Sequence, residues 1–133
     1  MRLAALLAAV LLAACHSAPK PTLIGWRPIV TFSGHGDSQT ESFNIETGQW
    51  RIKWTTSNEN PSGSGTFRVT VHSAISGRPL LVAVEHKGVG KGVAQVTEDP
   101  RLYHLVIDSA GVDWTVSVEE ASVSYGARLA YSK

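Results

Sequence analysis

Alternation of apolar and polar residues, repeated in short segments along most of the chain, limits the fold more than any other feature. In residues 49–56 every second side chain is large and apolar, and residues 65–75 and 112–119 repeat this pattern. A period of two is typical of β-strands that turn one face to a core and the other to water. After residue 29 no segment shows the 3.6-residue period of an amphipathic helix. The sequence therefore predicts an all-β domain.

The predicted strands are short and closely spaced. They cover residues 29–33, 40–46, 49–56, 65–75, 79–86, 92–97, 101–108 and 112–119. Residues 102–107 are apolar on both faces, as in a central strand. Thr47-Gly48 and Ser76-Gly77 have the residue types of tight hairpins, and Ser109-Ala110-Gly111 is expected to close the last pair of strands. About eight strands at this spacing predict one antiparallel β-sandwich, with a jelly-roll or an immunoglobulin-like topology.

Three of the four tryptophans are predicted to lie in the core. Trp50, Trp54 and Trp114 alternate in phase with the other apolar residues of their strands, which favours packing over an exposed sugar-binding platform. Trp26 lies outside the strand pattern and is the candidate for an exposed aromatic side chain. Residues 121–133 are expected to form either an edge strand or a tail, and their scattered apolar side chains favour the strand.

The N-terminus has the composition of a targeting segment. Met1-Arg2 is a short basic start, and the twelve residues from Leu3 to Ala14 contain no polar side chain. Crossing a bilayer as a helix takes about 20 apolar residues, so this run is too short to span one. It has the length of the apolar region of a secretory signal peptide. Residues 1–14 are therefore predicted to be a signal peptide.

The end of this run resembles the lipobox of bacterial lipoproteins, Leu-(Ala/Ser)-(Gly/Ala)-Cys. Leu12-Ala13-Ala14-Cys15 matches it at every position. The resemblance implies cleavage between Ala14 and Cys15, a diacylglyceryl thioether on Cys15 and acylation of the new amino group. Two or three acyl chains give stable membrane anchoring, whereas one gives only marginal binding. The membrane is thus an expected partner, and the covalent lipid on Cys15 takes the place of any cofactor. The alternatives are an ordinary signal peptide with an incidental cysteine and a buried N-terminal helix.

The residues after Cys15 suggest where the protein is held. His16 follows directly, and an aspartate at that place usually signals retention in the inner membrane of Gram-negative bacteria. Its absence favours the outer membrane if the host is Gram-negative. Residues 15–28 are expected to be the lipidated N-terminus and a tether; residues 16–25 contain two prolines and reach roughly 30 Å when extended. The β-sandwich is then expected over residues 29–120.

Composition bounds the rest of the molecule. Without residues 1–14 the chain has 119 residues, enough for one core, with 11 basic and 11 acidic side chains. This balance gives no basic footprint, so nucleic-acid binding is not expected. Cys15 is the only cysteine, so the domain has no disulfide framework.

Residues 30–120 also resemble small β-sandwich modules of uncharacterised secreted and lipid-anchored bacterial proteins. Those modules combine a glycine-rich first turn, a Trp-x-(Ile/Val)-x-Trp strand and a closing Trp-x-Val strand. Here these features are residues 32–36, Trp50 to Trp54 and Trp114 to Val116, together with Phe43. The resemblance implies a fold and no particular activity.

Gly34-His35-Gly36-Asp37 is the strongest candidate for a functional site in the sequence. A histidine and a carboxylate between glycines can bind a metal or form an acid–base pair, but a metal site needs three or four ligands and no second pair follows at suitable spacing. A glycine-built turn explains the stretch equally well. The sequence therefore predicts neither a catalytic residue nor a metal site. His35, Asp37 and Trp26 remain the candidate ligand-site residues.

Other motifs point to structure instead of chemistry. His104, in the central strand, is expected to be partly buried and hydrogen-bonded, and His72, on a polar face, to be solvated. Residues 88–92 lack the spacing of a phosphate loop, and no Gly-x-Ser-x-Gly nucleophile motif occurs.

Three functions follow as hypotheses. The first is a non-enzymatic, lipid-anchored module of the cell envelope that binds another protein or has a structural role. The second is a glycan-binding envelope module that uses exposed aromatic side chains. The third is a small envelope hydrolase with a cleft near His35 and Asp37.

Overall fold

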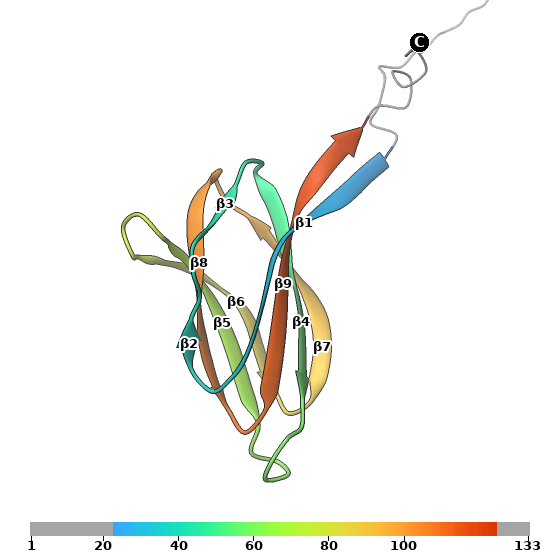
Figure 1. Ribbon diagram of the computed structural model, residues 1–133, viewed down its shortest axis with the longest axis vertical. Helices are drawn as coiled ribbons and strands as arrows, with labels where there is room; N and C mark the ends of the chain where they lie inside the picture. The colour runs from blue at the N-terminus through green and yellow to red at the C-terminus, as the bar shows by residue number, and fades with distance from the viewer. Residues whose placement is uncertain (1–22, 125–133) are drawn as a thin grey trace, which may run out of the picture. The chain divides into compact units, whose positions relative to one another are not determined.

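The computed structural model describes residues 23–124, and within that range all regular secondary structure is β-strand (Figure 1). The strands are β1 (Leu23–His35), β2 (Ser38–Gln39), β3 (Phe43–Ile45), β4 (Gln49–Ser57), β5 (Thr66–Ser73), β6 (Pro79–Lys87), β7 (Gly90–Thr97), β8 (Arg101–Ala110) and β9 (Asp113–Ser124). The all-β prediction is confirmed. The described range contains no helix long and apolar enough to cross a membrane. The predicted signal peptide, Cys15 and residues 125–133 lie outside the described residues.

The strands form two antiparallel sheets that pack as a sandwich over one compact unit, Trp26–Ser122. The four-stranded sheet has the order β1-β9-β4-β7. In the five-stranded sheet the order is β2-β8-β5-β6, and β3 also pairs with β8. Ser38 lies opposite Ile107 and Phe43 opposite Tyr103, so β2 and β3 follow one another along the same side of β8. The central position predicted for residues 102–107 is confirmed.

The order of the strands identifies the topology as a jelly roll. If β2 and β3 count as one interrupted strand, eight strands remain, and only β5 and β6 are both consecutive and paired. All the remaining connections along the chain pass from one sheet to the other. An immunoglobulin sandwich instead keeps several consecutive strands together in one sheet, whereas interleaved sheets of eight strands are typical of jelly rolls.

This interleaving corrects two of the predicted turns. Ser76-Gly77 does close a hairpin, between β5 and β6, and Gly77 has the positive φ of 78° that a tight turn favours. Thr47-Gly48, in contrast, joins β3 to β4, which lie in different sheets, so the predicted hairpin is wrong. Ser109-Ala110-Gly111 likewise leads from β8 into β9 in the other sheet. Turn residues specify a reversal of the chain, and they leave open which sheet receives the next strand.

The first and last strands are longer than the sequence pattern indicates. β1 begins at Leu23, inside the segment expected to be a tether, and Pro28 is tolerated because β1 is an edge strand. β9 continues to Ser124, so the described part of the expected C-terminal strand is an extension of β9. β1 and β9 are neighbours, and each provides backbone partners that let the other extend.

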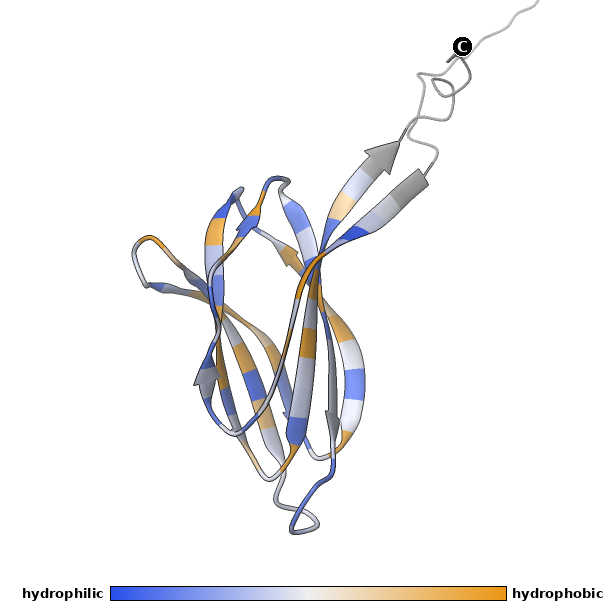
Figure 2. Cartoon of the chain, in the orientation of Figure 1, coloured by the Kyte–Doolittle hydropathy of each residue, from blue (hydrophilic) through white to orange (hydrophobic). Residues whose placement is uncertain are grey.

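The core lies between the facing sheets, and the alternating colours along the strands in Figure 2 show the two-residue period that builds it. Trp50, Trp54 and Trp114 are buried in it, which confirms the prediction for these tryptophans. The ring of Trp50 lies 5.5 Å from that of Phe43 and 5.0 Å from that of Tyr103, between centroids. The buried apolar residues packed around them are Phe43, Ile45, Ile52, Phe67, Val69, Val71, Val84, Val96, Tyr103, Leu105, Ile107, Val116 and Val118.

Candidate functional site

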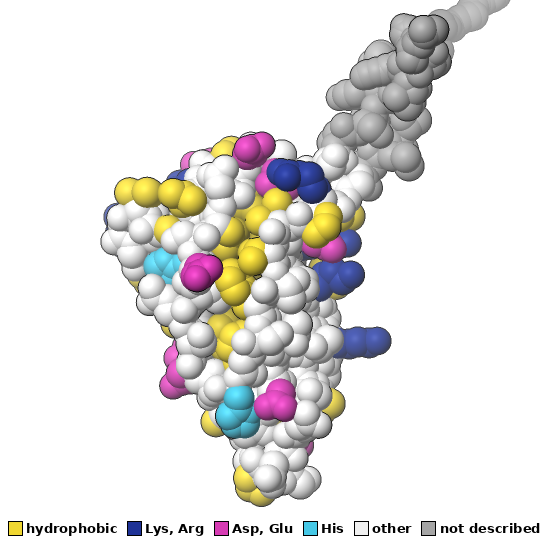
Figure 3. All heavy atoms as spheres, viewed as in Figure 1, with side chains coloured by type: hydrophobic (Ala, Val, Ile, Leu, Met, Phe, Trp, Pro, Cys, Tyr) yellow, Lys and Arg dark blue, Asp and Glu magenta, His cyan; other side chains and the backbone are white. Residues whose placement is uncertain are grey.

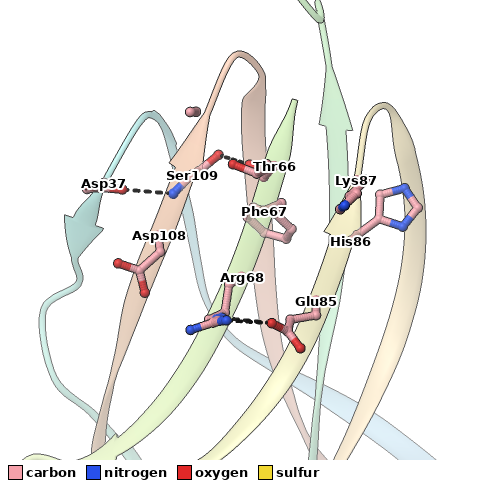
Figure 4. Close-up of a pocket in the computed structure, with 10 residues that line it drawn as sticks. Asp37, Thr66, Phe67, Arg68, Glu85, His86, Lys87, Asp108 and Ser109 are labelled. Carbon is pink, nitrogen blue, oxygen red and sulfur yellow. Dashed lines mark hydrogen bonds and ion pairs between the residues drawn. The ribbon is translucent and has the colours of Figure 1, made fainter. Parts of the chain in front are cut away.

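A cleft of about 900 Å³ opens on the outer face of the five-stranded sheet (Figure 4). Its charged lining comes from three strands and one connection: Arg68 from β5, Glu85 and Lys87 from β6, Asp108 from β8, and Asp37 from the link between β1 and β2. Three carboxylates and two cations therefore face one volume of solvent. We call this group the charged cleft.

Register brings these side chains together. Arg68 lies directly opposite Glu85 on one neighbouring strand and Asp108 on the other, so the three form one row across the sheet. Alternation along β5 turns Phe67 and Val69 into the core and leaves Arg68 on the outer face. The same period of two that builds the core therefore also builds the cleft.

Only some of the charged side chains of the cleft form ion pairs or hydrogen bonds within the described part of the protein. Nε and Nη2 of Arg68 both donate to Oε2 of Glu85, at 3.0 and 2.6 Å. More than half of each side chain is exposed, so this ion pair contributes little to stability. Neither Asp108 nor Lys87 has a hydrogen bond or ion pair from its side chain to any residue that the structure describes. One free anion and one free cation thus remain for a ligand.

Asp37 forms the rim of the cleft beside β8. Its Oδ1 accepts a hydrogen bond from the backbone N–H of Ser109 at 2.9 Å, and the Ser109 hydroxyl donates to the carbonyl of Thr66 at 2.8 Å. Figure 4 shows both bonds along the same edge. They fix the link between β1 and β2 against the ends of β8 and β5. Asp37 is thus the one sequence-predicted candidate that lines the cleft.

His35 lies elsewhere, on the outer side of β1. Its Nδ1 is 2.8 Å from Oδ1 of Asp113, and Nδ2 of Asn58 donates to the other Asp113 oxygen at 2.8 Å. Hydrogen bonds from Asn58 and His35 lower the pKa of Asp113 from its ordinary value. The carboxylate partner of His35 is therefore Asp113, and the pairing of His35 with Asp37 that the local sequence suggests does not form.

The glycines around His35 have the structural role that the turn interpretation gives them. Gly36 has a φ of 84°, and its carbonyl accepts a hydrogen bond from Nε1 of Trp114 at 2.9 Å. At Gly34, a Cβ atom would lie 2.6 Å from the Trp114 ring. Any side chain at Gly34 would therefore displace a core tryptophan.

Trp26, the remaining candidate, is half-buried on the outer side of the four-stranded sheet. The guanidinium of Arg51 lies over its ring, 4.1 Å from the centroid, and Nε of Arg51 donates to Glu119 at 2.7 Å. Trp26 and His35 are nine positions apart on β1, about 30 Å in an extended strand. The structure therefore places the three predicted candidates in three separate surroundings and does not unite them in one site.

Two histidines meet at a different place on the five-stranded sheet. His104 is buried, with 8% of its surface exposed, and its ring stacks on that of His72 with a centroid distance of 5.2 Å. The expected burial of His104 is confirmed. The expected hydrogen bond is not found among the described residues. His72 itself is half-buried instead of solvated.

This contact predicts a pH-dependent stability. Burial, and secondarily the neighbouring His72, lowers the pKa of His104, so the folded state favours the neutral ring. A lowered pKa stabilises the fold above the unfolded value of about 6.5, and this contribution is lost as pH falls below it. The urea midpoint should therefore decrease between pH 7 and pH 5. His104→Gln should flatten that decrease, while Thr70→Ser on the same face should retain it; equal slopes in all three proteins would contradict the assignment.

The sequence pattern does not identify the charged residues of the cleft as a site. Arg68 lies at a polar position of a correctly predicted strand, and Glu85 does too. This outward polarity was the only local signal, and it is shared by every solvent-facing residue of the sandwich. Among residues 23–124, no group of three or more His, Cys, Asp and Glu side chains is arranged to hold a metal ion. The charged cleft is the candidate site that the geometry favours.

Comparison with known proteins adds no family to this description. No protein-family model, no curated protein and no solved structure matches the chain.

Proposed function

We propose that the chain is a lipid-anchored protein of the bacterial cell envelope whose β-sandwich binds another envelope protein through the charged cleft, without catalysing a reaction. The observation that carries the proposal is the convergence of five charged side chains from separate segments into one cleft, with Asp108 and Lys87 left free for a partner. The anchor rests on the match of residues 12–15 to the lipobox.

The position of the cleft in the sandwich supports this arrangement. β1 enters the compact unit at Trp26, beside Arg51 and Glu119, and reaches His35 about 30 Å further on. Asp37 follows directly and lines the cleft. The cleft therefore lies at the opposite end of the compact unit from Trp26.

The lining of the cleft favours a protein partner over a glycan. Sugar sites commonly use an open aromatic ring as a stacking surface, but Phe67, the aromatic residue in the lining, is only 2% exposed. His86 packs its ring against Trp54, with 4.9 Å between centroids. Charges of both signs suit a peptide surface with acidic and basic side chains. On the face seen in Figure 3 acidic groups are interspersed with basic ones, which does not favour nucleic acid.

The surroundings of His35 support binding in preference to hydrolysis. A histidine–aspartate pair acts in nucleophilic catalysis when the other ring nitrogen activates a hydroxyl or a water in a sheltered site. Here the side chains of His35 and Asp113 are 65% and 48% exposed. In the described part of the chain the nearby hydroxyl of Ser33 is bonded to Thr115 instead of to His35.

Photo-crosslinking in intact cells tests this function. A crosslinking amino acid replaces Thr66, an exposed residue inside the cleft, or Gln95, an exposed residue on β7 in the other sheet. We expect one discrete protein adduct from position 66 and none from position 95. Arg68→Glu should reduce that adduct about tenfold, equivalent to ~1.4 kcal/mol of binding free energy.

The matched control is Arg78→Glu, the same charge change in the exposed turn between β5 and β6. It should leave the adduct at position 66 unchanged. Equal labelling from positions 66 and 95, or an adduct that survives Arg68→Glu, would show that the cleft is not the binding surface.

A further inference from the structure

His72 and His104 lie side by side on the outer face of the five-stranded sheet. They are direct cross-strand partners on β5 and β8, and their rings are 5.2 Å apart between centroids with an interplanar angle of 27°. Their neighbours along each strand, Val71 and Leu105 among them, point into the core. Both imidazoles therefore project from one row of the sheet, as cross-strand pairs do.

The hydrogen bond of His72 sets which nitrogen is free. Its Nδ1 lies 3.1 Å from the carbonyl oxygen of Gly77, in the turn between β5 and β6. A carbonyl oxygen only accepts, so Nδ1 carries the proton and the neutral ring presents an unprotonated Nε2. Histidines that bind metals commonly donate their other ring N–H to a backbone carbonyl in this way, which fixes the ring and its tautomer.

His104 is available as a second ligand. Burial lowers the pKa of His104, which favours the neutral imidazole, the form that binds metals. No hydrogen bond engages its ring within residues 23–124. Within the same residues the only buried side-chain nitrogen or oxygen without a partner is Nε1 of Trp50, so the ring nitrogens of His104 reach solvent.

The spacing of the rings matches binding of one ion. Two imidazoles that bind the same ion at about 2.1 Å through nitrogen have ring centres roughly 4.5–5.5 Å apart, depending on the angle at the metal. The observed 5.2 Å lies in this range. The rings stack with an interplanar angle of 27°, so binding of one ion requires the His104 ring to rotate until its nitrogen points at the same position as Nε2 of His72.

We propose that His72 and His104 form a two-histidine site for a divalent transition-metal ion. Imidazole ligands suit Cu²⁺, Ni²⁺ and Zn²⁺, with the highest affinity for Cu²⁺. In the described part of the chain no third His, Cys, Asp or Glu completes a cluster, so water occupies the other coordination positions. His72 is four positions from Arg68 along β5, about 13 Å away. The metal site and the charged cleft are therefore separate, and a negative result for one does not affect the other.

Titration of the purified full chain with Ni²⁺, followed by calorimetry, tests the site. We expect His72→Asn and His104→Asn each to weaken the strongest Ni²⁺ binding at least tenfold. His86→Asn, a change on the next strand, should leave it unchanged. Binding should also weaken from pH 7.5 to pH 5, because protons compete for the imidazoles.

Comparison between variants separates this site from other groups that bind Ni²⁺. Cys15, His16 and the other residues outside the pair are unchanged in His72→Asn and His104→Asn and cannot produce a difference between these variants and the unmodified chain. Circular dichroism verifies that each variant is folded, and His72→Asn, at the less buried position, decides the question if His104→Asn unfolds. Ni²⁺ affinities that agree across the unmodified chain and the folded pair variants would overturn the proposal, as would no binding by the unmodified chain.

Discussion

Trp50→Ala is expected to lower the free energy of unfolding by about 3–5 kcal/mol, the typical cost of removing a buried Trp or Phe side chain from a core. Trp50 has no exposed surface, and its ring contacts those of Phe43 and Tyr103. These contacts join β4 in one sheet to β3 and β8 in the other. A domain of this size has about 5–15 kcal/mol of stability in total, so the variant loses a large share of it.

Urea denaturation followed by far-ultraviolet circular dichroism measures this effect. With a slope of about 2 kcal/mol per molar urea, the midpoint should fall by roughly 1.5–2.5 M. Trp26→Ala is the matched control, because Trp26 is half-buried outside the core and contributes a surface contact with Arg51 worth about 0.5–1 kcal/mol. If both substitutions cost the same, the core assigned around Trp50 is wrong.

Cys15→Ser is expected to remove the protein from the membrane fraction almost completely. The proposed anchor is a thioether, and a serine hydroxyl does not replace the sulfur that forms it. Each buried CH₂ of a lipid chain contributes about 0.8 kcal/mol to membrane binding, so loss of two or three chains abolishes stable attachment. Metabolic labelling with a fatty-acid analogue and cell fractionation both report this change.

Ser17→Ala provides the control for Cys15→Ser, since it changes a neighbouring small residue of the same segment. It should leave both labelling and fractionation unaltered. Continued membrane association of the unlabelled Cys15→Ser protein would show that something other than the lipid holds the chain there.

Much of the fold could be predicted because the two-residue alternation depends only on the residues within each strand. The pattern predicts a strand over residues 49–56, and the structure has Gln49–Ser57. It predicts another over residues 79–86, and the structure has Pro79–Lys87. Pairing was not predictable in the same way. Gly48 and Gly77 look alike in sequence, yet only Gly77 has a positive φ and closes a hairpin. Long-range contacts between the sheets decide where each strand goes.

The candidate site was harder to predict than the fold. Arg68 meets Glu85 and Asp108, residues 17 and 40 positions further along the chain, because β6 and β8 both pair with β5. The contact of His72 with His104 depends on the same pairing. A single sequence shows which residues face outward, but register and strand order decide which of them meet. Asp37 is predictable as a candidate because it directly follows a glycine-rich turn in the sequence.

The lipid anchor is tested most directly by the intact mass of the protein extracted from the membrane fraction. The expected mass is that of residues 15–133 with a diacylglyceryl group on Cys15, increased by one further acyl chain if the amino group is modified. The mass of residues 1–133, or that of residues 15–133 without lipid, would contradict the assignment of this β-sandwich to a lipid-anchored envelope protein.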